Sequence, residues 1–214
     1  MKLRTGILNL LFPPKCVCCG KIINAPREEI CPECNRSLPW AGTAVKYGDF
    51  HEGVVSSLRY EGNLREAVLR YKFQGNYWLG EVFGELMAET VAMQLTGRFD
   101  FITWAPISKR RRRLRTYDQA ELLAKPIGRI LDVPVIHGLR KTRHTKANSS
   151  LGGEKERRTN VAGAYEALPC VTGKRILLID DIYTTGSTLS ECAKTLMQAG
   201  AESVVCVTFA RAGE

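Results

Sequence analysis

The sequence predicts an α/β protein in which a parallel-centred sheet follows a small cysteine-rich N-terminal module. The first observation is a strand, loop, helix and strand unit formed by residues 175–180, 181–186, 187–199 and 203–210. Such a β–α–β crossover joins parallel strands. The second is a pair of CxxC motifs near the N-terminus, and the third is length: 214 residues suffice for one full α/β domain plus an appended module. We therefore expect a module over residues 1–42 and a larger domain over 43–214.

The start of the chain is apolar but interrupted. Residues 1–12 carry two basic side chains and then apolar ones, Asn9 breaks the run, and Pro13 and Pro14 end it. Because no small-x-small cleavage site follows, we interpret this stretch as a short amphipathic helix that docks on the protein. No stretch reaches the 18 or so apolar residues of a membrane span, so a cytoplasmic protein without a membrane span is expected.

The middle of the chain alternates between strand and helix patterns. Segments 45–60, 99–105 and 133–136 are typical of strands, whereas 63–71, 78–95 and 117–131 keep the helical spacing of apolar residues. Asn63 is a candidate N-cap of the first helix. Pro126 lies inside the third, where a proline costs about 3 kcal/mol, so a kink or a break is expected there. Residues 137–160 lack apolar periodicity and are predicted to form a long loop of the kind that serves as a lid or binding loop.

Four cysteines have the spacing of a metal site. Cys16 and Cys19 form one CxxC turn, and Cys31 and Cys34 form a second. Four thiolates so arranged can close a tetrahedral Zn²⁺ site, and four sulfurs leave no open position, which favours a structural zinc. Cys18 could substitute as a ligand or stay free, and the alternative for the whole set is free or redox-active thiols.

The most informative stretch follows the strand at 175–180. Two carboxylates, Asp180 and Asp181, stand where the strand ends, and a helix then opens on hydroxyl-bearing residues and a glycine. The start of a helix offers free backbone N–H groups, so these residues can hold a phosphate while the carboxylates accept hydrogen bonds from vicinal ribose hydroxyls. A ribose 5-phosphate joins both groups in one ligand. The elements of a Walker A loop and of a dinucleotide-binding GxGxxG loop are missing. The alternative is an ordinary turn and an N-capped helix. The expected cradle consists of Thr184, Thr185, Gly186, Ser187 and Thr188.

The net charge of +9 is concentrated in two segments. Residues 108–115 carry +6 and residues 137–159 carry +5, so the rest of the chain carries −2. Localised positive charge indicates an anionic partner such as phosphates or nucleic acid, and the alternative is a solvated loop without a partner.

Several motifs together resemble one known family. The stretch 177–188 is similar to the phosphoribosyl pyrophosphate (PRPP) motif of type I phosphoribosyltransferases. An ordered set of further motifs resembles the ComF family, whose members are competence protein F-like or GntX-like proteins. That set consists of Leu11-Phe-Pro-Pro-Lys-Cys16, the CxxC pairs, Arg59-Tyr-Glu-Gly62, Lys72-Phe-Gln-Gly75, Asp118-Gln-Ala-Glu-Leu-Leu-Ala124 and Glu156-Arg-Arg-Thr-Asn-Val-Ala-Gly-Ala-Tyr165.

The resemblance implies a type I phosphoribosyltransferase fold behind a double zinc ribbon, and roles for both basic segments. Residues 106–115 would contact pyrophosphate, with Lys109, Arg110 and Arg113 as candidates, and residues 137–160 would close over the site as a hood. Mg²⁺ would accompany PRPP if the protein is catalytic, with positioning and electrostatics doing the chemistry. The resemblance also implies single-stranded DNA handling during DNA uptake, with a competence helicase-type partner.

Three functions are compatible with the sequence. They are a ComF-like protein that binds PRPP or ribose 5-phosphate and handles single-stranded DNA, a phosphoribosyltransferase acting on a nitrogenous base, and a PRPP sensor without chemistry. No motif for base recognition is visible, which weakens the second. Trp104, Tyr117 and Tyr165 lie near the basic segments and could stack bases, or could simply pack in the core.

Overall fold

The computed structural model describes residues 13–23, 28–43, 46–146 and 152–213. The helix expected over residues 1–12 lies outside the described residues. Along the chain the elements are α2 (Pro32–Arg36), β1 (Lys46–Gly48), β2 (His51–Arg59), α3 (Gly62–Phe73), α4 (Leu79–Gln94), β3 (Phe101–Trp104), α5 (Lys109–Arg115), α6 (Gln119–Leu131), β4 (Leu139–Lys141), α7 (Glu154–Val161), β5 (Tyr165–Ala167), the 3₁₀ helix η2 (Pro169–Val171), β6 (Arg175–Tyr183), α8 (Ser187–Gln198) and β7 (Ser203–Arg211).

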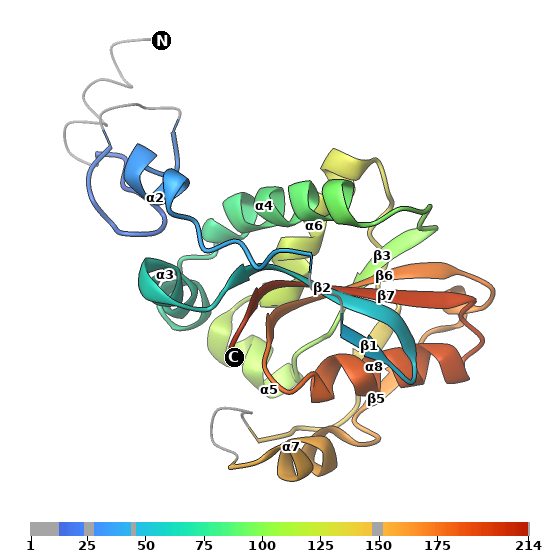
Figure 1. Ribbon diagram of the computed structural model, residues 1–214. Helices are drawn as coiled ribbons and strands as arrows, with labels where there is room; N and C mark the ends of the chain where they lie inside the picture. Colours follow the sequence, from blue (N-terminus) through green and yellow to red (C-terminus); the bar gives the residue numbers. More distant parts are fainter. Residues whose placement is uncertain (1–12, 24–27, 44–45, 147–151, 214) are drawn as a thin grey trace, which may run out of the picture.

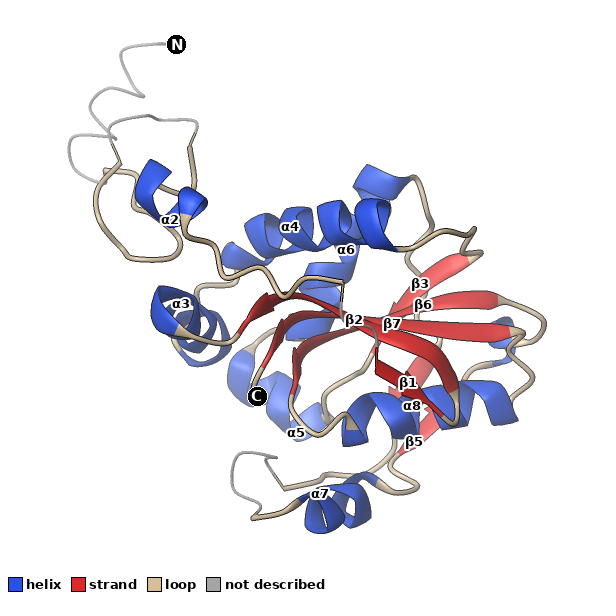
Figure 2. Cartoon of the chain, in the orientation of Figure 1, coloured by secondary structure: helices blue, strands red, loops and turns tan. Residues whose placement is uncertain are grey.

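The main sheet has five strands in the order β1-β2-β7-β6-β3. The strands β2, β7, β6 and β3 run parallel, and β1 is antiparallel to β2 (Figure 2). A mixed, mostly parallel sheet confirms the predicted fold class. Within the described residues, no helix is long and apolar enough to cross a membrane.

Helices cover both faces of the sheet, which explains why β6 has a continuous apolar run. The helices α4 and α6 lie on one face and α8 lies on the other (Figure 1). Leu177 and Ile179 belong to the core under α4 and α6, while Ile176 and Leu178 belong to the core under α8. Successive side chains of a strand point to opposite faces, so a strand covered on both faces is apolar at every position.

The helix α6 continues through Pro126, so the expected break is wrong. Pro126 is buried where α6 packs on α4, and a β-carbon at Gly84 of α4 would collide with the proline ring. The close contact between the two helices therefore stabilises a helix that local propensity disfavours. The N-cap expected at Asn63 is also wrong, because α3 begins at Gly62 with Glu61 in the cap position.

Both basic segments are more regular than the sequence predicts. The arginine run forms the helix α5, and the hydroxyl of Ser108 accepts a hydrogen bond from the N–H of Arg111 at its start. The expected long loop contains β4, which pairs with β5, and the helix α7. The expected strand at 133–136 reduces to a single bridge between Val135 and Ile102.

Candidate functional site

The carboxylate pair lies at the carboxyl end of β6, inside a cavity of about 330 Å³. The strand β6 continues to Tyr183, three residues beyond the predicted end, and pairs there with Arg211 of β7. Asp180 and Asp181 therefore stand on strand backbone rather than on a loop, which fixes their positions. The carboxyl ends of parallel strands are the usual ligand-binding edge of such a sheet.

The predicted phosphate cradle lies next to this pair at the start of α8. Gly186 is the N-cap in the left-handed region, with φ of 72°, and a β-carbon there would lie 2.8 Å from the Tyr183 ring. Glycine is therefore required both by the backbone angle and by the close approach of that ring. The hydroxyls of Thr185 and Ser187 lie 2.8 Å apart. Thr184, Gly186, Ser187 and Thr188 line the cavity, so the free N–H groups of the α8 start face the same space as the carboxylates.

Positive side chains from four separate elements surround the two carboxylates. The Nζ atom of Lys72 lies 2.9 Å from Oδ2 of Asp181. The other basic residues that line the cavity are Arg111 and Arg115 of α5, Lys141 of β4 and Arg157 of α7. A cavity lined by cations around a helix start can bind a ligand that carries more than one phosphate.

Burial shifts the pKa of two groups in this cavity. Burial and the neighbouring Asp181 charge raise the pKa of Asp180 above the usual range of an aspartate. Burial lowers the pKa of Lys141 to about 8, and its Nζ atom donates to the Tyr165 hydroxyl at 2.8 Å. Both groups are therefore easier to neutralise than the same side chains in water.

The pyrophosphate candidates fall outside this cavity. Lys109 and Arg110 line a second hollow, together with Arg140, Lys141 and Arg143. Arg113 is exposed and lines neither space. The cavity instead receives Arg111 and Arg115, whose spacing of four residues places them on one face of α5. Lys109 and Arg113 have the same spacing on another face of the helix, so the sequence alone does not distinguish the two pairs.

A buried aspartate holds the turn between β3 and α5. The backbone N–H of Ile107 donates to Oδ2 of Asp118 at 2.9 Å, and burial raises the pKa of Asp118 to about 6. Pro106 and Ile107 line the cavity, so Asp118 fixes one of its walls.

The three aromatic residues that could stack bases or pack in the core are all buried, and Tyr165 also lines the cavity. Trp104 is buried and stacks on His137 with ring centroids 5.2 Å apart. The buried Tyr117 donates its hydroxyl to the carbonyl of Tyr71, and Tyr165 is buried beside Lys141. An exposed aromatic at the cavity rim was missed.

That rim residue is Phe73, which lines the cavity and is 63% exposed. The guanidinium carbon of Arg115 lies 5.0 Å from the Phe73 ring centroid. This pair presents a planar, apolar and cationic surface at the mouth of the cavity.

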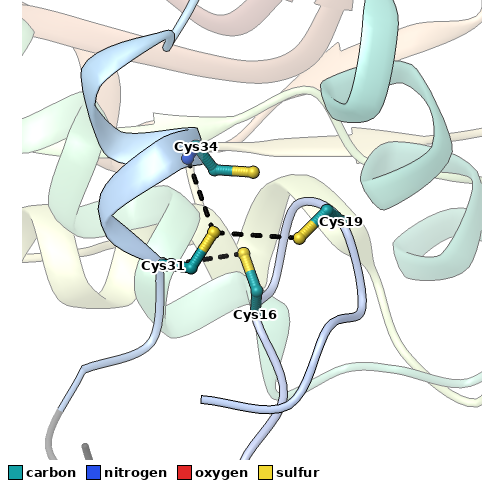
Figure 3. Close-up of side chains that lie close together, drawn as sticks. All are labelled: Cys16, Cys19, Cys31 and Cys34. Atoms are coloured by element: carbon teal, nitrogen blue, oxygen red, sulfur yellow. Dashed lines mark hydrogen bonds between the residues drawn. The ribbon is translucent and has the colours of Figure 1, made fainter. Parts of the chain in front are cut away.

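The four cysteines predicted to bind zinc come together at a distance from the cavity. The sulfur atoms of Cys16, Cys19, Cys31 and Cys34 all lie within 4.8 Å of one another (Figure 3). The sulfurs of Cys19 and Cys31 are 3.8 Å apart. Sulfurs at about 2.3 Å from a tetrahedral zinc would lie about 3.8 Å apart, so the donor set fits a Zn–S₄ site.

Backbone amides and neighbouring side chains support this cluster. The N–H of Cys31 donates to the sulfur of Cys16 at 3.3 Å, and the N–H of Cys34 donates to the sulfur of Cys31 at 3.4 Å. Burial raises the pKa of Cys16, but amide hydrogen bonds outweigh burial and lower that pKa to about 6. A lowered pKa favours the thiolate that a metal requires.

Cys18 lies outside the cluster of four sulfurs, so it does not take the place of one of the predicted ligands. Its side chain is buried, and burial raises its pKa to about 12. The carbonyls of Val17 and Cys18 accept hydrogen bonds from the Arg70 guanidinium, at 2.6 and 2.9 Å. This stretch therefore ties the cysteine module to α3.

Comparison with known proteins identifies the family. A double zinc ribbon domain model matches residues 7–45, and a phosphoribosyl transferase domain model matches residues 118–214. The chain is 30% identical over 218 residues to competence protein ComFC of Streptococcus pneumoniae, covering 97% of this chain and 93% of that one. The chain belongs to the ComF family.

Other relatives are similar along most of this ComF-family chain. Competence protein F of Haemophilus influenzae is 27% identical over 229 residues, covering 94% of this chain and 98% of its own. DNA utilization protein YhgH of Escherichia coli is 25% identical over 202 residues, with coverages of 88% and 86%. The double zinc ribbon match and the four-cysteine cluster agree on a structural zinc site.

Proposed function

We propose that this ComF-family protein binds PRPP or ribose 5-phosphate in the cavity at the end of β6 and takes part in single-stranded DNA handling during DNA uptake. The observation that carries the ligand assignment is that one cavity joins the carboxylate pair, the cradle at the start of α8 and five basic side chains. The carboxylates suit ribose hydroxyls, the cradle suits the 5-phosphate, and the arginines suit further phosphates. The competence-related names of the relatives support the process.

Titration of ribose 5-phosphate by calorimetry tests the ligand assignment, and Gly186→Ala is the informative variant. The new methyl group would meet the Tyr183 ring and strain a backbone at φ of 72°. We expect ribose 5-phosphate to bind the wild type, and the variant to bind at least about 10-fold more weakly, the equivalent of roughly 1.4 kcal/mol.

Gly173→Ala is the matched control, because Gly173 has φ of 66° and no atom within 4 Å of the new β-carbon. It carries the same backbone strain at the opposite end of β6. A Gly186→Ala variant that binds like Gly173→Ala would remove the cradle from the proposal.

Transfer of the phosphoribosyl group to a nitrogenous base is the second candidate function. Phe73 and Arg115 at the cavity rim favour it, because a flat base can stack on an aromatic ring or a guanidinium group. Arg111 and Arg115 would then stabilise the charge of the departing pyrophosphate. Release of pyrophosphate from PRPP, screened against a set of bases, distinguishes this candidate from binding alone.

The second hollow is the surface we assign to single-stranded DNA. Basic residues outnumber acidic ones on it, and Glu166 pairs with Arg140 there at 2.6 Å. Each neutralised phosphate of a single strand contributes about −0.7 to the slope of log affinity against log salt. With four to six contacts, a fourfold rise in salt should weaken binding roughly 50- to 350-fold.

Removing three exposed charges from this hollow should flatten the salt dependence. For the triple variant Lys109→Gln, Arg110→Gln and Arg143→Gln we expect a slope less steep by about 2. The control variant replaces Arg98, Lys125 and Lys174 with glutamine; these residues are exposed and line neither the cavity nor the second hollow. Fluorescence anisotropy with labelled oligonucleotides measures both slopes, and equal slopes would refute the assignment.

A further inference from the structure

An ion pair inside the cavity involves Lys72, which lies outside the residues that the phosphoribosyl transferase domain model matches. The Nζ atom of Lys72 lies 2.9 Å from Oδ2 of Asp181, and the two side chains are 18% and 17% exposed. Lys72 belongs to the last turn of α3, whereas the model matches residues 118–214. Both residues line the cavity next to Asp180. This is therefore a largely buried pair at the ligand site rather than a surface contact.

The end of α3 that carries Lys72 is fixed from both sides. The preceding residue, Tyr71, is buried and donates its hydroxyl to the carbonyl of Gln119 at 2.7 Å. The carbonyl of Tyr71 accepts a hydrogen bond from the hydroxyl of Tyr117. These bonds connect α3 to the start of α6 on both the side chain and the backbone of Tyr71. The backbone of Lys72 is consequently held in place, close enough for its side chain to contact Asp181.

The charges around the carboxylate pair leave little room for a divalent cation at Asp181. Mg²⁺ prefers oxygen ligands in octahedral geometry and keeps several waters. Here one carboxylate oxygen of Asp181 already contacts an ammonium group, and Asp180 accepts the backbone N–H of Asp181 at 2.8 Å. Lys141 and Arg111 line the same cavity. A Mg²⁺ ion bound to Asp181 would have to displace Lys72 and approach these cations, so the residues present fit the ion poorly.

We propose that Lys72 takes the place of a divalent cation at the carboxylate pair, so that a ribose 5-phosphate ligand binds without Mg²⁺. The inference rests on the proposed function, because it concerns the same cavity. Lys72 neutralises Asp181 and keeps two further N–H donors, which can contact the hydroxyl or phosphate oxygens of a ligand. The positive charge that the site needs is then supplied by the fold itself.

Calorimetric titration of ribose 5-phosphate, with and without millimolar Mg²⁺, tests the proposal. Ribose 5-phosphate is preferred over PRPP because the pyrophosphate group of PRPP binds Mg²⁺ by itself. The magnesium-free buffer is prepared on a chelating resin before the protein is added, since a free chelator would remove zinc from the cysteine cluster. For the wild type we expect the same dissociation constant in both buffers, within about twofold.

The variant Lys72→Gln should create a dependence on Mg²⁺. Without Mg²⁺, we expect binding to weaken by about 10- to 100-fold, because a charged hydrogen-bonding partner is lost and the Asp181 carboxylate, no longer paired with Lys72, repels the ligand's phosphate. Mg²⁺ should then recover part of the loss. Lys72→Arg keeps the charge and should bind without Mg²⁺. Arg65→Gln removes an exposed charge from the same helix and should behave like the wild type.

The outcomes separate this inference from the proposed function. A wild type that binds neither ribose 5-phosphate nor PRPP in either buffer would overturn both, and a wild type that binds PRPP but not ribose 5-phosphate would overturn the inference alone. A wild type that binds only with Mg²⁺ would overturn the inference and leave the proposed function in place. A Lys72→Gln variant that binds normally without Mg²⁺, or that Mg²⁺ does not improve, would also overturn the inference. If Lys72→Gln does not fold, titrations of the wild type and Lys72→Arg with and without Mg²⁺ still test the inference.

Discussion

Cys31→Ser is expected to lose the bound zinc and to unfold the cysteine module. Structural zinc supplies an apparent binding free energy of about 10–16 kcal/mol in small ribbon domains, and that energy is also their folding energy. Cys31 contributes one of the four clustered sulfurs, and it also caps α2 by accepting the N–H of Cys34. Its loss removes a ligand and a helix cap together. The variant Cys34→Ser should also lose zinc and unfold the module.

Elemental analysis of the purified protein measures this effect, with one zinc per chain expected in the wild type. Cys170→Ser is a control because Cys170 is exposed and far along the chain, and Cys18→Ser is a sharper one because Cys18 is buried beside the cluster. Both should keep zinc. Full zinc content in both Cys31→Ser and Cys34→Ser would contradict the four-sulfur site.

The cysteine module contacts α3, so the structural effect of losing zinc should extend beyond the module. Arg70 of α3 donates hydrogen bonds to the carbonyls of Val17 and Cys18, and the amide of Asn63 contacts the Cys34 sulfur at 3.9 Å. Because α3 also carries Lys72, a zinc-free protein should bind ribose 5-phosphate more weakly than the intact one. The module thus connects to the ligand site through one helix.

The second large effect is expected from the double variant Asp180→Asn and Asp181→Asn. In the wild type, ribose 5-phosphate at 100 times its dissociation constant should stabilise the protein by about 2.7 kcal/mol, or roughly 5–10 °C in melting temperature. The variant replaces both carboxyl groups that we propose to contact the ribose hydroxyls, and it releases Lys72 from its pair. We therefore expect the ligand-induced rise to disappear. An unchanged rise would mean that the ribose binds elsewhere.

Two further variants show whether such a loss is specific. Asp49→Asn with Asp132→Asn removes the same charge from exposed positions and should leave the ligand-induced rise unchanged. In the absence of ligand, the single variant Asp180→Asn should have a melting temperature no lower than that of the wild type. The folded protein raises the pKa of Asp180, so its ionised form costs stability once the pH exceeds the pKa of the unfolded chain. A neutral amide avoids that cost.

The central motif of the proposed ligand site could be recognised from sequence because it lies on one continuous segment. Asp180 and Asp181 lie at the end of a buried strand, and Gly186 opens the next helix, so the order of residue types along the chain is enough to suggest the proposed ligand. The cysteine pairs are similar, since each CxxC turn is a local structure and two such turns make four ligands. The division between residues 42 and 43, and the cytoplasmic location, stay predictions.

The remaining cavity residues could not be assigned because they come from elements far apart in the chain. Lys72, Arg111 and Lys141 lie on α3, α5 and β4, and only the packing of these elements around β6 turns them toward the carboxylates. The arginine run illustrates the difficulty. Its six basic residues cannot be told apart from sequence, but in the helix α5 their side chains project from different faces. Arg111 and Arg115 then reach the cavity, while Lys109 and Arg110 line the second hollow.

The sequence by itself predicted the fold class and the four cysteines that cluster, and it suggested the segment we propose to bind ribose and phosphate, because periodicity and short-range spacing encode each of them. The tertiary structure decided which cations meet the carboxylates, why α6 runs through Pro126, and which aromatic residues are exposed. Buried contacts between distant segments override local preference at Pro126, and they bury Trp104 and Tyr117 while leaving Phe73 at the rim. Such contacts depend on how helices pack on a sheet, and no local pattern along the chain records them.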